Sequence, residues 1–182
     1  IYSVVLVEEG VVPIFMSMIQ ALDEKEIIEA CVEGFVNLST NQKNKREISS
    51  SGISNHLSKI LTMKDSPLCR SYALLMVGNL LSSGFLHDKI ARSDVIIAIL
   101  NMMVPKIPKQ FVAVSFCLCQ ICLTPPSAKM VVECGVIPKA VGLLDSVQSA
   151  VTDSDGQPIK GTGVRDGVAY LWTLLINLSN EP

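Results

Sequence analysis

The sequence contains few charged residues for a chain of its length. Lys, Arg, Asp and Glu make up 18% of its 182 residues, and the formal net charge is −2. A nearly neutral chain has no global positive field that would attract nucleic acid. Its only basic cluster, Lys43, Lys45 and Arg46, is expected to lie in a solvated loop.

The sequence also lacks the residue patterns of an enzyme. Its only two histidines, His56 and His87, belong to no Ser/His/Asp or Cys/His set at a meaningful spacing. A glycine-rich phosphate loop and metal-ligand spacing are absent as well. We therefore expect no catalytic site, no cofactor, no metal site and no small-molecule substrate.

No segment is long enough to span a membrane, although the chain is apolar. Hydrophobic residues make up 49%, and the mean hydropathy is +0.43. The longest charge-free run lies between Lys109 and Lys129, and its helical part, 111–123, falls short of the roughly 20 residues that a span needs. A solenoid cut from a longer chain would be equally apolar, because stacked repeats share apolar interfaces. With no initiator methionine and no signal peptide in the sequence, we expect such an excerpt.

The six cysteines do not have the spacing of a disulfide framework. Three of them, Cys117, Cys119 and Cys122, lie in one apolar helical run. Cys119 and Cys122 share a helix face and Cys117 points elsewhere, so the three thiols do not converge on a metal. Reduced, buried cysteines are favoured instead, which indicates an intracellular, cytoplasmic protein.

What the sequence does contain is an internal repeat of about 42 residues. An Asn-Leu pair follows an apolar run at Asn37, Asn79 and Asn177. A small or turn-forming residue precedes an apolar run at spacings of 42, 42 and 41 residues, at Gly10, Gly52, Asp94 and Gly135. Four positions before each of these stands an apolar residue: Leu6, Ile48, Ile90 and Val131. Three markers in one register predict helical repeats that stack.

Residues 42–80 illustrate one repeat. They predict a short helix that ends near Gly52, a medium helix, a turn at Pro67, and a long helix that is apolar on more than half its circumference. The apolar runs are too long and too rich in Leu, Met and Ala for strands, so the sequence predicts an all-α fold. One row of the long helices is predicted to be buried: Leu38, Leu80, Ile121 and Leu178.

The three-helix repeat, the Gly-Val-Val-Pro and Gly-Val-Ile-Pro openings of two second helices, and the Asn-Leu pairs of the third helices resemble armadillo repeats. HEAT repeats are the alternative, but they typically have two helices. The resemblance implies a right-handed α-solenoid of about four armadillo repeats with three helices each. The expected repeats cover residues 1–41 (with a partial first helix), 42–83, 84–126 and 127–182.

The resemblance also implies a non-enzymatic scaffold that binds an extended or helical segment of a protein partner along a concave groove of third helices. In such grooves an amide can pair with both a C=O and an N–H of a strand-like ligand. Positions four and seven residues earlier share the amide's helix face. The residues of the predicted groove are Asn37, Tyr72, Leu75, Asn79, Phe116, Gln120, Tyr170, Thr173 and Asn177. Alternatively, the amides only tie neighbouring helices together.

Two further functions are weighed against this one. Armadillo receptors for nuclear-localisation signals carry tryptophan four residues before the asparagine, where this chain has Glu33, Leu75, Phe116 and Thr173. The only tryptophan, Trp172, is one residue out of register and is predicted to be core, which disfavours a nuclear-import adaptor. A structural component docked in a cytoskeletal or ciliary (axonemal) assembly, through its outer surface or a loop, remains the alternative.

The period breaks in the last repeat. Gln120 and Asn177 are 57 residues apart, and the extra residues fall in a stretch rich in Ser, Thr, Asp and Gly. We expect an exposed loop insertion at about 146–163, which could contact a partner. The Asp-Ser-Asp-Gly at 153–156 is no calcium loop, because Val151 and Thr162 stand where acids are needed.

Overall fold

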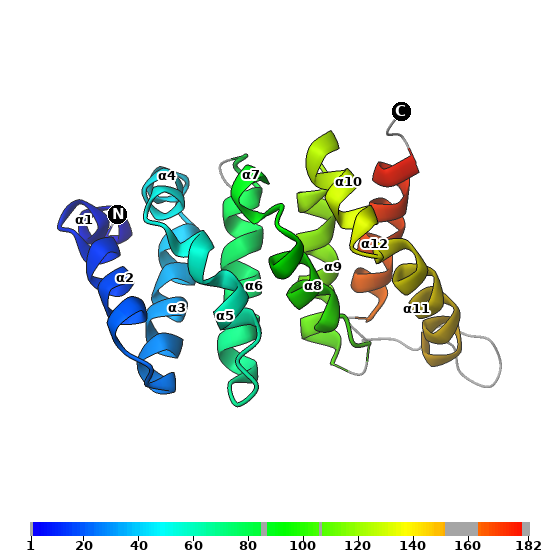
Figure 1. The fold of residues 1–182 in the computed structure, drawn as a ribbon, viewed down its shortest axis with the longest axis horizontal. Coiled ribbons are helices and arrows are strands. Elements are labelled where there is room, and N and C mark those ends of the chain that lie inside the picture. The colour runs from blue at the N-terminus through cyan, green and yellow to red at the C-terminus, as the bar shows by residue number, and fades with distance from the viewer. Residues whose placement is uncertain (1, 85–86, 106, 152–163, 180–182) are drawn as a thin grey trace. The chain divides into compact units, whose positions relative to one another are not determined.

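The computed structural model describes residues 2–84, 87–105, 107–151 and 164–179, and it is all helical: no strand occurs in these ranges. The predicted all-α class is therefore confirmed. The chain divides into two compact units, residues 1–90 and 91–182 (Figure 1). Each unit has its own buried core.

The first unit alternates short, medium and long helices. In chain order they are α1 (Tyr2–Glu8), α2 (Val11–Ala21), α3 (Lys25–Ser39), α4 (Gln42–Ser50), a 3-10 turn (Ile53–His56) that continues into α5 (Leu57–Leu61), α6 (Pro67–Leu81) and α7 (His87–Ile90). Gly10 and Gly52 separate a short helix from the next one, and both have φ of 89°. Only glycine adopts this left-handed conformation without strain, so the predicted turns form where the glycines stand.

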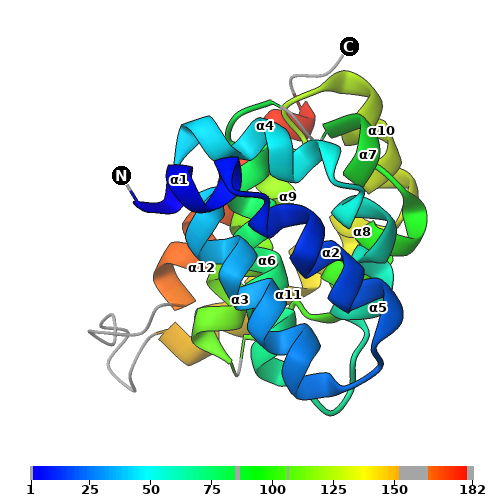
Figure 2. The same ribbon diagram turned by 90° about the vertical axis from the view of Figure 1, so that its left-hand side faces the viewer.

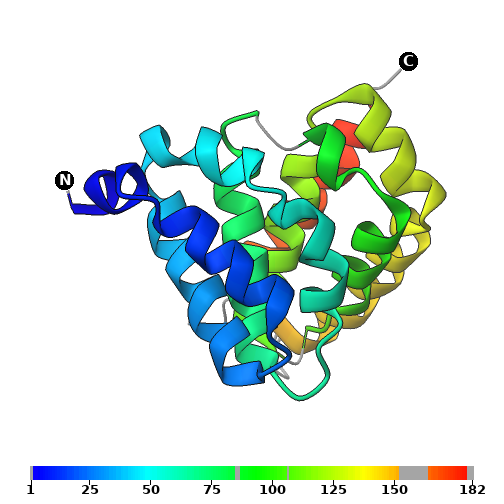
Figure 3. The ribbon, with the colours of Figure 1, turned by 60° about the vertical axis from the view of Figure 1, so that its left-hand side comes forward.

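The long helices α3 and α6 lie side by side, with α2 packed along α3 (Figures 2 and 3). Phe35 of α3 is fully buried and meets Phe15 of α2 edge to face, with ring centroids 5.5 Å apart. A Cβ at Gly34 would lie only 2.4 Å from the Phe15 ring. Gly34 therefore permits the close approach of α2 to α3.

The short helix α4 packs against the ends of its neighbours. Asn44 is buried, and its side-chain nitrogen donates to the backbone oxygens of Ser3 and Leu38, both at 3.1 Å. Lys45 is buried too, and its Nζ donates to Ser82 Oγ at 3.1 Å. The predicted loop is therefore wrong, and the predicted solvation fails for Lys45 alone, since Lys43 and Arg46 of the same helix are exposed. Lys45 buries its aliphatic stem in the helix packing while its amine reaches a hydroxyl group.

The second unit contains three long helices. Its elements are α8 (Ser93–Asn101), α9 (Pro108–Ile121), α10 (Pro125–Glu133), α11 (Val136–Val151) and α12 (Val164–Ser179), and the long ones are α9, α11 and α12. Gly135, with φ of 84°, separates α10 from α11. Helices α9 and α12 pack closely, because Gly167 lacks the Cβ that would lie 2.4 Å from the Phe111 ring.

Some sequence expectations need correction. Leu38, Leu80 and Ile121 are buried as predicted, but Leu178, in the last turn of α12, is only half-buried. In α1 the buried side chain is Val7, and Leu6 is 52% exposed.

The predicted loop insertion is wrong for its first residues. Residues 146–151 continue α11, whose apolar periodicity carries the helix to Val151. The rest of the predicted loop, 152–163, lies outside the described residues.

Candidate partner-binding faces

The first candidate face lies on α3 and α6 of the first unit. Tyr72, Leu75 and Asn79 project from one side of α6, because they are spaced three and four residues apart. Leu75 is 47% exposed, Tyr72 and Asn79 are half-buried, and Asn37 on α3 is exposed. The structure thus brings the four predicted groove residues of this unit to accessible positions on two neighbouring helices. We call this set the α3/α6 face.

Acidic side chains of α3 border the α3/α6 face. The hydroxyl group of Tyr72 is hydrogen-bonded to the carboxylate of Glu33. The pKa of Tyr72 is raised, and desolvation is the largest cause. The charge and hydrogen bond of Glu33 and the charge of Glu29 add smaller contributions. Tyr72 therefore keeps its proton to a higher pH than an isolated tyrosine does.

Asn79 connects the two helices directly. Its side-chain nitrogen donates to Ser39 Oγ at 3.0 Å, and Ser39 in turn donates to the Val36 carbonyl at 2.7 Å. Ser39 is buried and Asn79 is half-buried, so the bond lies at the edge of the core. The interpretation of the amide as a tie between helices therefore holds for one of its two N–H groups.

The second candidate face lies on α9 and α12 of the second unit, and we call it the α9/α12 face. Phe116 and Tyr170 are in edge contact, with ring centroids 5.3 Å apart and planes at 65°. Both rings are half-buried, as is Gln120 on α9. Thr173 is exposed and bonds its own helix, donating to the Ala169 carbonyl at 3.0 Å.

Asn177 repeats the tie seen in the first unit with a different acceptor. Its side-chain nitrogen lies 3.7 Å from Cys119 Sγ on α9. A sulfur acceptor makes a weaker bond than a hydroxyl oxygen. The five groove residues predicted for the second unit therefore lie on two packed helices, and two of them, Phe116 and Tyr170, touch each other.

Trp172 is not in the core, contrary to the prediction. It is 55% exposed, and Ile176, one turn further along α12, is 56% exposed. Helix α12 buries Leu171 and Leu174 instead, and a helix that packs on one side leaves the opposite side to solvent. Sequence reasoning missed this because the most apolar residues of a helix are expected inside.

Sequence reasoning also missed the surroundings of Ser66. Its hydroxyl group accepts from the backbone N–H of Cys69 at 3.2 Å and donates to Glu29 Oε2 of α3 at 2.5 Å. Burial, with the nearby Glu29 charge, raises the pKa of Cys69 to about 11. This thiol is therefore uncharged at neutral pH and unreactive.

Among the residues that the structure describes, no group of three His, Cys, Asp or Glu side chains could hold a metal ion. In the same part of the chain no single helix is long and apolar enough to cross a membrane. Within these residues, only the pair α1 and α2 taken together has the length and apolar composition of a membrane span, and the two helices are bent by 67° relative to each other.

No family model matches the sequence, and the comparison with curated proteins gives no match either. Among solved structures, the chain is similar to an engineered protein whose crystal structure was a target of the Northeast Structural Genomics Consortium. The TM-score is 0.73 at 16% identity, over 97% of this chain and 50% of that one. This chain thus spans about half the length of the engineered protein. At this identity the likeness shows a helical fold alone.

Proposed function

We propose that the chain is a right-handed α-solenoid of about four armadillo repeats and acts as a non-enzymatic scaffold for protein–protein interaction. The order of short, medium and long helices supports the repeats, as do the left-handed glycines at Gly10, Gly52 and Gly135. The repeat boundaries at 41/42, 83/84 and 126/127 stay a prediction. Partner binding in an intracellular, cytoplasmic setting belongs to the same proposal.

The observation that carries the binding proposal is the accessibility of apolar and amide side chains on the third helices. On α6, Leu75 is 47% exposed between Tyr72 and Asn79, while Ala73, Leu74 and Met76 are fully buried. Aromatic and large aliphatic side chains of this kind dominate interface energetics. The accessible amides offer donors and acceptors to the backbone of a bound segment.

The test uses two leucine-sized side chains that are equally exposed. Leu75 on α6 and Ile97 on α8 are both 47% exposed, so replacing either by Asp removes similar apolar area. Partners are first identified by affinity purification of the full-length protein. Purified partner is then titrated against Leu75→Asp and Ile97→Asp.

We expect Leu75→Asp to weaken partner binding by about tenfold or more, because it buries a charge under the partner. Ile97→Asp should leave the binding unchanged, because Ile97 lies outside the proposed interface. Circular dichroism controls for the fold. If both variants bind as the parent protein does, the third-helix face is not the interface. Docking through another surface, as in a cytoskeletal or ciliary assembly, would then replace this proposal.

A further inference from the structure

A second surface of the first unit, away from the residues of the α3/α6 face, is hollowed between α2 and α4. It is an open hollow of about 730 Å³, a volume within the size range of ligand pockets. Its wall on α2 is built from one helix face at spacings of three and four residues: Pro13, Met16, Ser17 and Gln20. Its wall on α4 is built in the same way from Lys43, Arg46, Glu47 and Ser50. We call this hollow the α2/α4 cavity.

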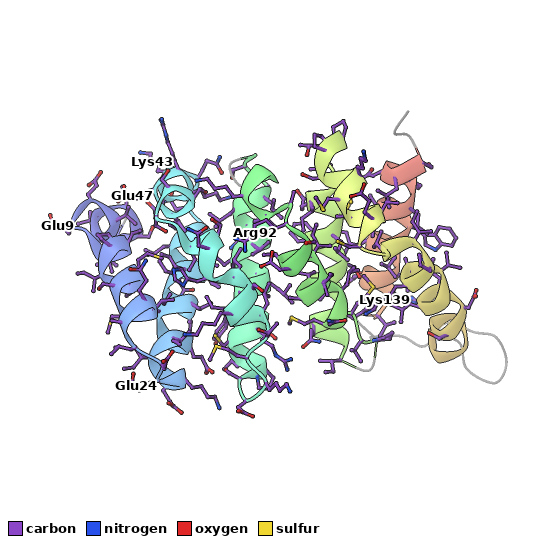
Figure 4. The ribbon with its side chains drawn as sticks, viewed as in Figure 1. Glu9, Glu24, Lys43, Glu47, Arg92 and Lys139 are labelled. Atoms are coloured by element: carbon purple, nitrogen blue, oxygen red, sulfur yellow. The ribbon has the colours of Figure 1, made fainter. Side chains whose placement is uncertain are left out.

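The floor and the rim of the α2/α4 cavity differ in chemistry. Pro13 is exposed and is the accessible apolar residue of the floor, whereas Val12 and Met16 are almost fully buried, at 2% and 4% exposure, and hold α2 in the core. Lys43 and Arg46 are exposed at the rim. Figure 4 shows Lys43 extending away from α4, with Glu47 one turn further along that helix.

The two rim cations are available to a ligand. The ion pairs found in the described ranges are Lys59 with Asp23 and Arg92 with Asp94, and neither involves Lys43 or Arg46. Glu47 is the only acidic residue that lines the cavity, so the rim has a net positive charge. A ligand with one negative group beside an apolar group complements both rim and floor.

We propose that the α2/α4 cavity binds a short acidic segment of a partner protein, in which a carboxylate side chain stands next to an apolar one. The carboxylate pairs with Arg46 and Lys43, and Arg46 supplies a planar guanidinium that can bind it through two parallel hydrogen bonds. The apolar side chain lies on Pro13, above the buried Val12 and Met16. This site is separate from the α3/α6 face, and its test does not depend on that face.

Two labelled peptides serve as probes for fluorescence anisotropy with the 182-residue chain. One alternates Glu with Leu, and the other alternates Lys with Leu at the same length. We expect the acidic peptide to bind at least about tenfold more tightly than the basic one, with a preference that falls as salt screens the exposed charges. Equal binding of the two peptides would overturn the proposal.

Three variants locate the site. Lys43→Glu with Arg46→Glu should reduce the affinity for the acidic peptide by about tenfold, and Glu47→Gln should raise it by about twofold to fivefold, since it removes a repulsion. A misfolded protein could not produce the increase. Lys64→Glu with Lys129→Glu makes the same charge change at two exposed residues outside the cavity and is the matched control.

Two results would contradict this assignment. If Lys64→Glu with Lys129→Glu weakens binding as much as the rim reversal, the peptide responds only to net charge. If citrate displaces the peptide at an equal concentration, the cavity is a small-anion site and the protein segment is the wrong ligand.

Discussion

At the scale of single residues, leucines on the same helix differ sharply in burial. Leu80 of α6 is fully buried, whereas Leu68 is 50% exposed. Replacing Leu80 by Ala should lower the free energy of unfolding by about 2–5 kcal/mol, because it removes buried methyl groups and leaves a cavity. Leu68→Ala is the control and should cost less than about 1 kcal/mol. Urea denaturation followed by circular dichroism measures both, and equal losses would contradict the observed register of α6.

The burial of a residue was predictable from the sequence where neighbouring helices cover both sides of its helix. Elsewhere the prediction of burial was wrong. Leu38, Leu80 and Ile121 follow the apolar period and are buried. Trp172 was predicted from its apolar character, but burial depends on which helix covers that side, and none of the described helices covers it. For Lys45 the opposite prediction, exposure to solvent, was wrong. Its long aliphatic stem can be buried while its amine stays hydrogen-bonded.

At the scale of helices, α6 is fixed at its start by a side chain that serves two helices. Ser66 caps the backbone N–H of Cys69 and also donates to Glu29 of α3. Ser66→Ala should therefore reduce the stability by about 1–2 kcal/mol, at the upper end for a lost helix cap. Ser71→Ala, within the same helix, removes only a bond to Pro67 and should be nearly neutral, since Ala favours helix.

Thermal unfolding of the Ser66 and Ser71 variants provides the comparison. A melting temperature for Ser66→Ala that equals that of Ser71→Ala would show that the cap and the Glu29 bond contribute nothing. Double substitution with Glu29→Gln separates the two contributions, because coupled residues give non-additive losses.

The helices themselves were largely predictable, since their boundaries are marked by residues with special backbones. Gly52 and Gly135 end short helices with positive φ, and Pro67 begins a long one. The end of α11 was not predicted, because residues 146–151 mix polar residues typical of a loop with apolar residues at helical spacing. The face residues were placed on the correct helices, but the Asn79 bond to Ser39 depends on a contact between helices 40 residues apart in the chain.

At the scale of the whole molecule, apolar side chains remain exposed on both units. They include Tyr2 at 86% and Ile14 at 55% in the first unit, and Trp172 and Ile176 in the second. We expect the 182-residue chain to self-associate as its concentration rises, because contact between such surfaces removes apolar area from water. Sedimentation velocity over a range of concentrations measures this.

The matched variants for self-association lie on α12. Trp172→Lys with Ile176→Lys should shift the chain toward monomer, whereas Thr173→Lys adds charge on the same exposed helix without removing apolar surface. A chain that is monomeric at all concentrations, or that responds equally to Thr173→Lys, would contradict the expectation.

The bond from Asn79 to Ser39 has a consequence for the thermodynamics of recognition. An asparagine on a surface normally rotates among several rotamers, and a ligand that binds it must stop this motion at a cost in entropy. The Ser39 hydroxyl already restrains the Asn79 amide, so part of that cost is met when the protein folds. Breaking the tie with Ser39→Ala should therefore make binding at this amide less favourable in entropy while its enthalpy changes little.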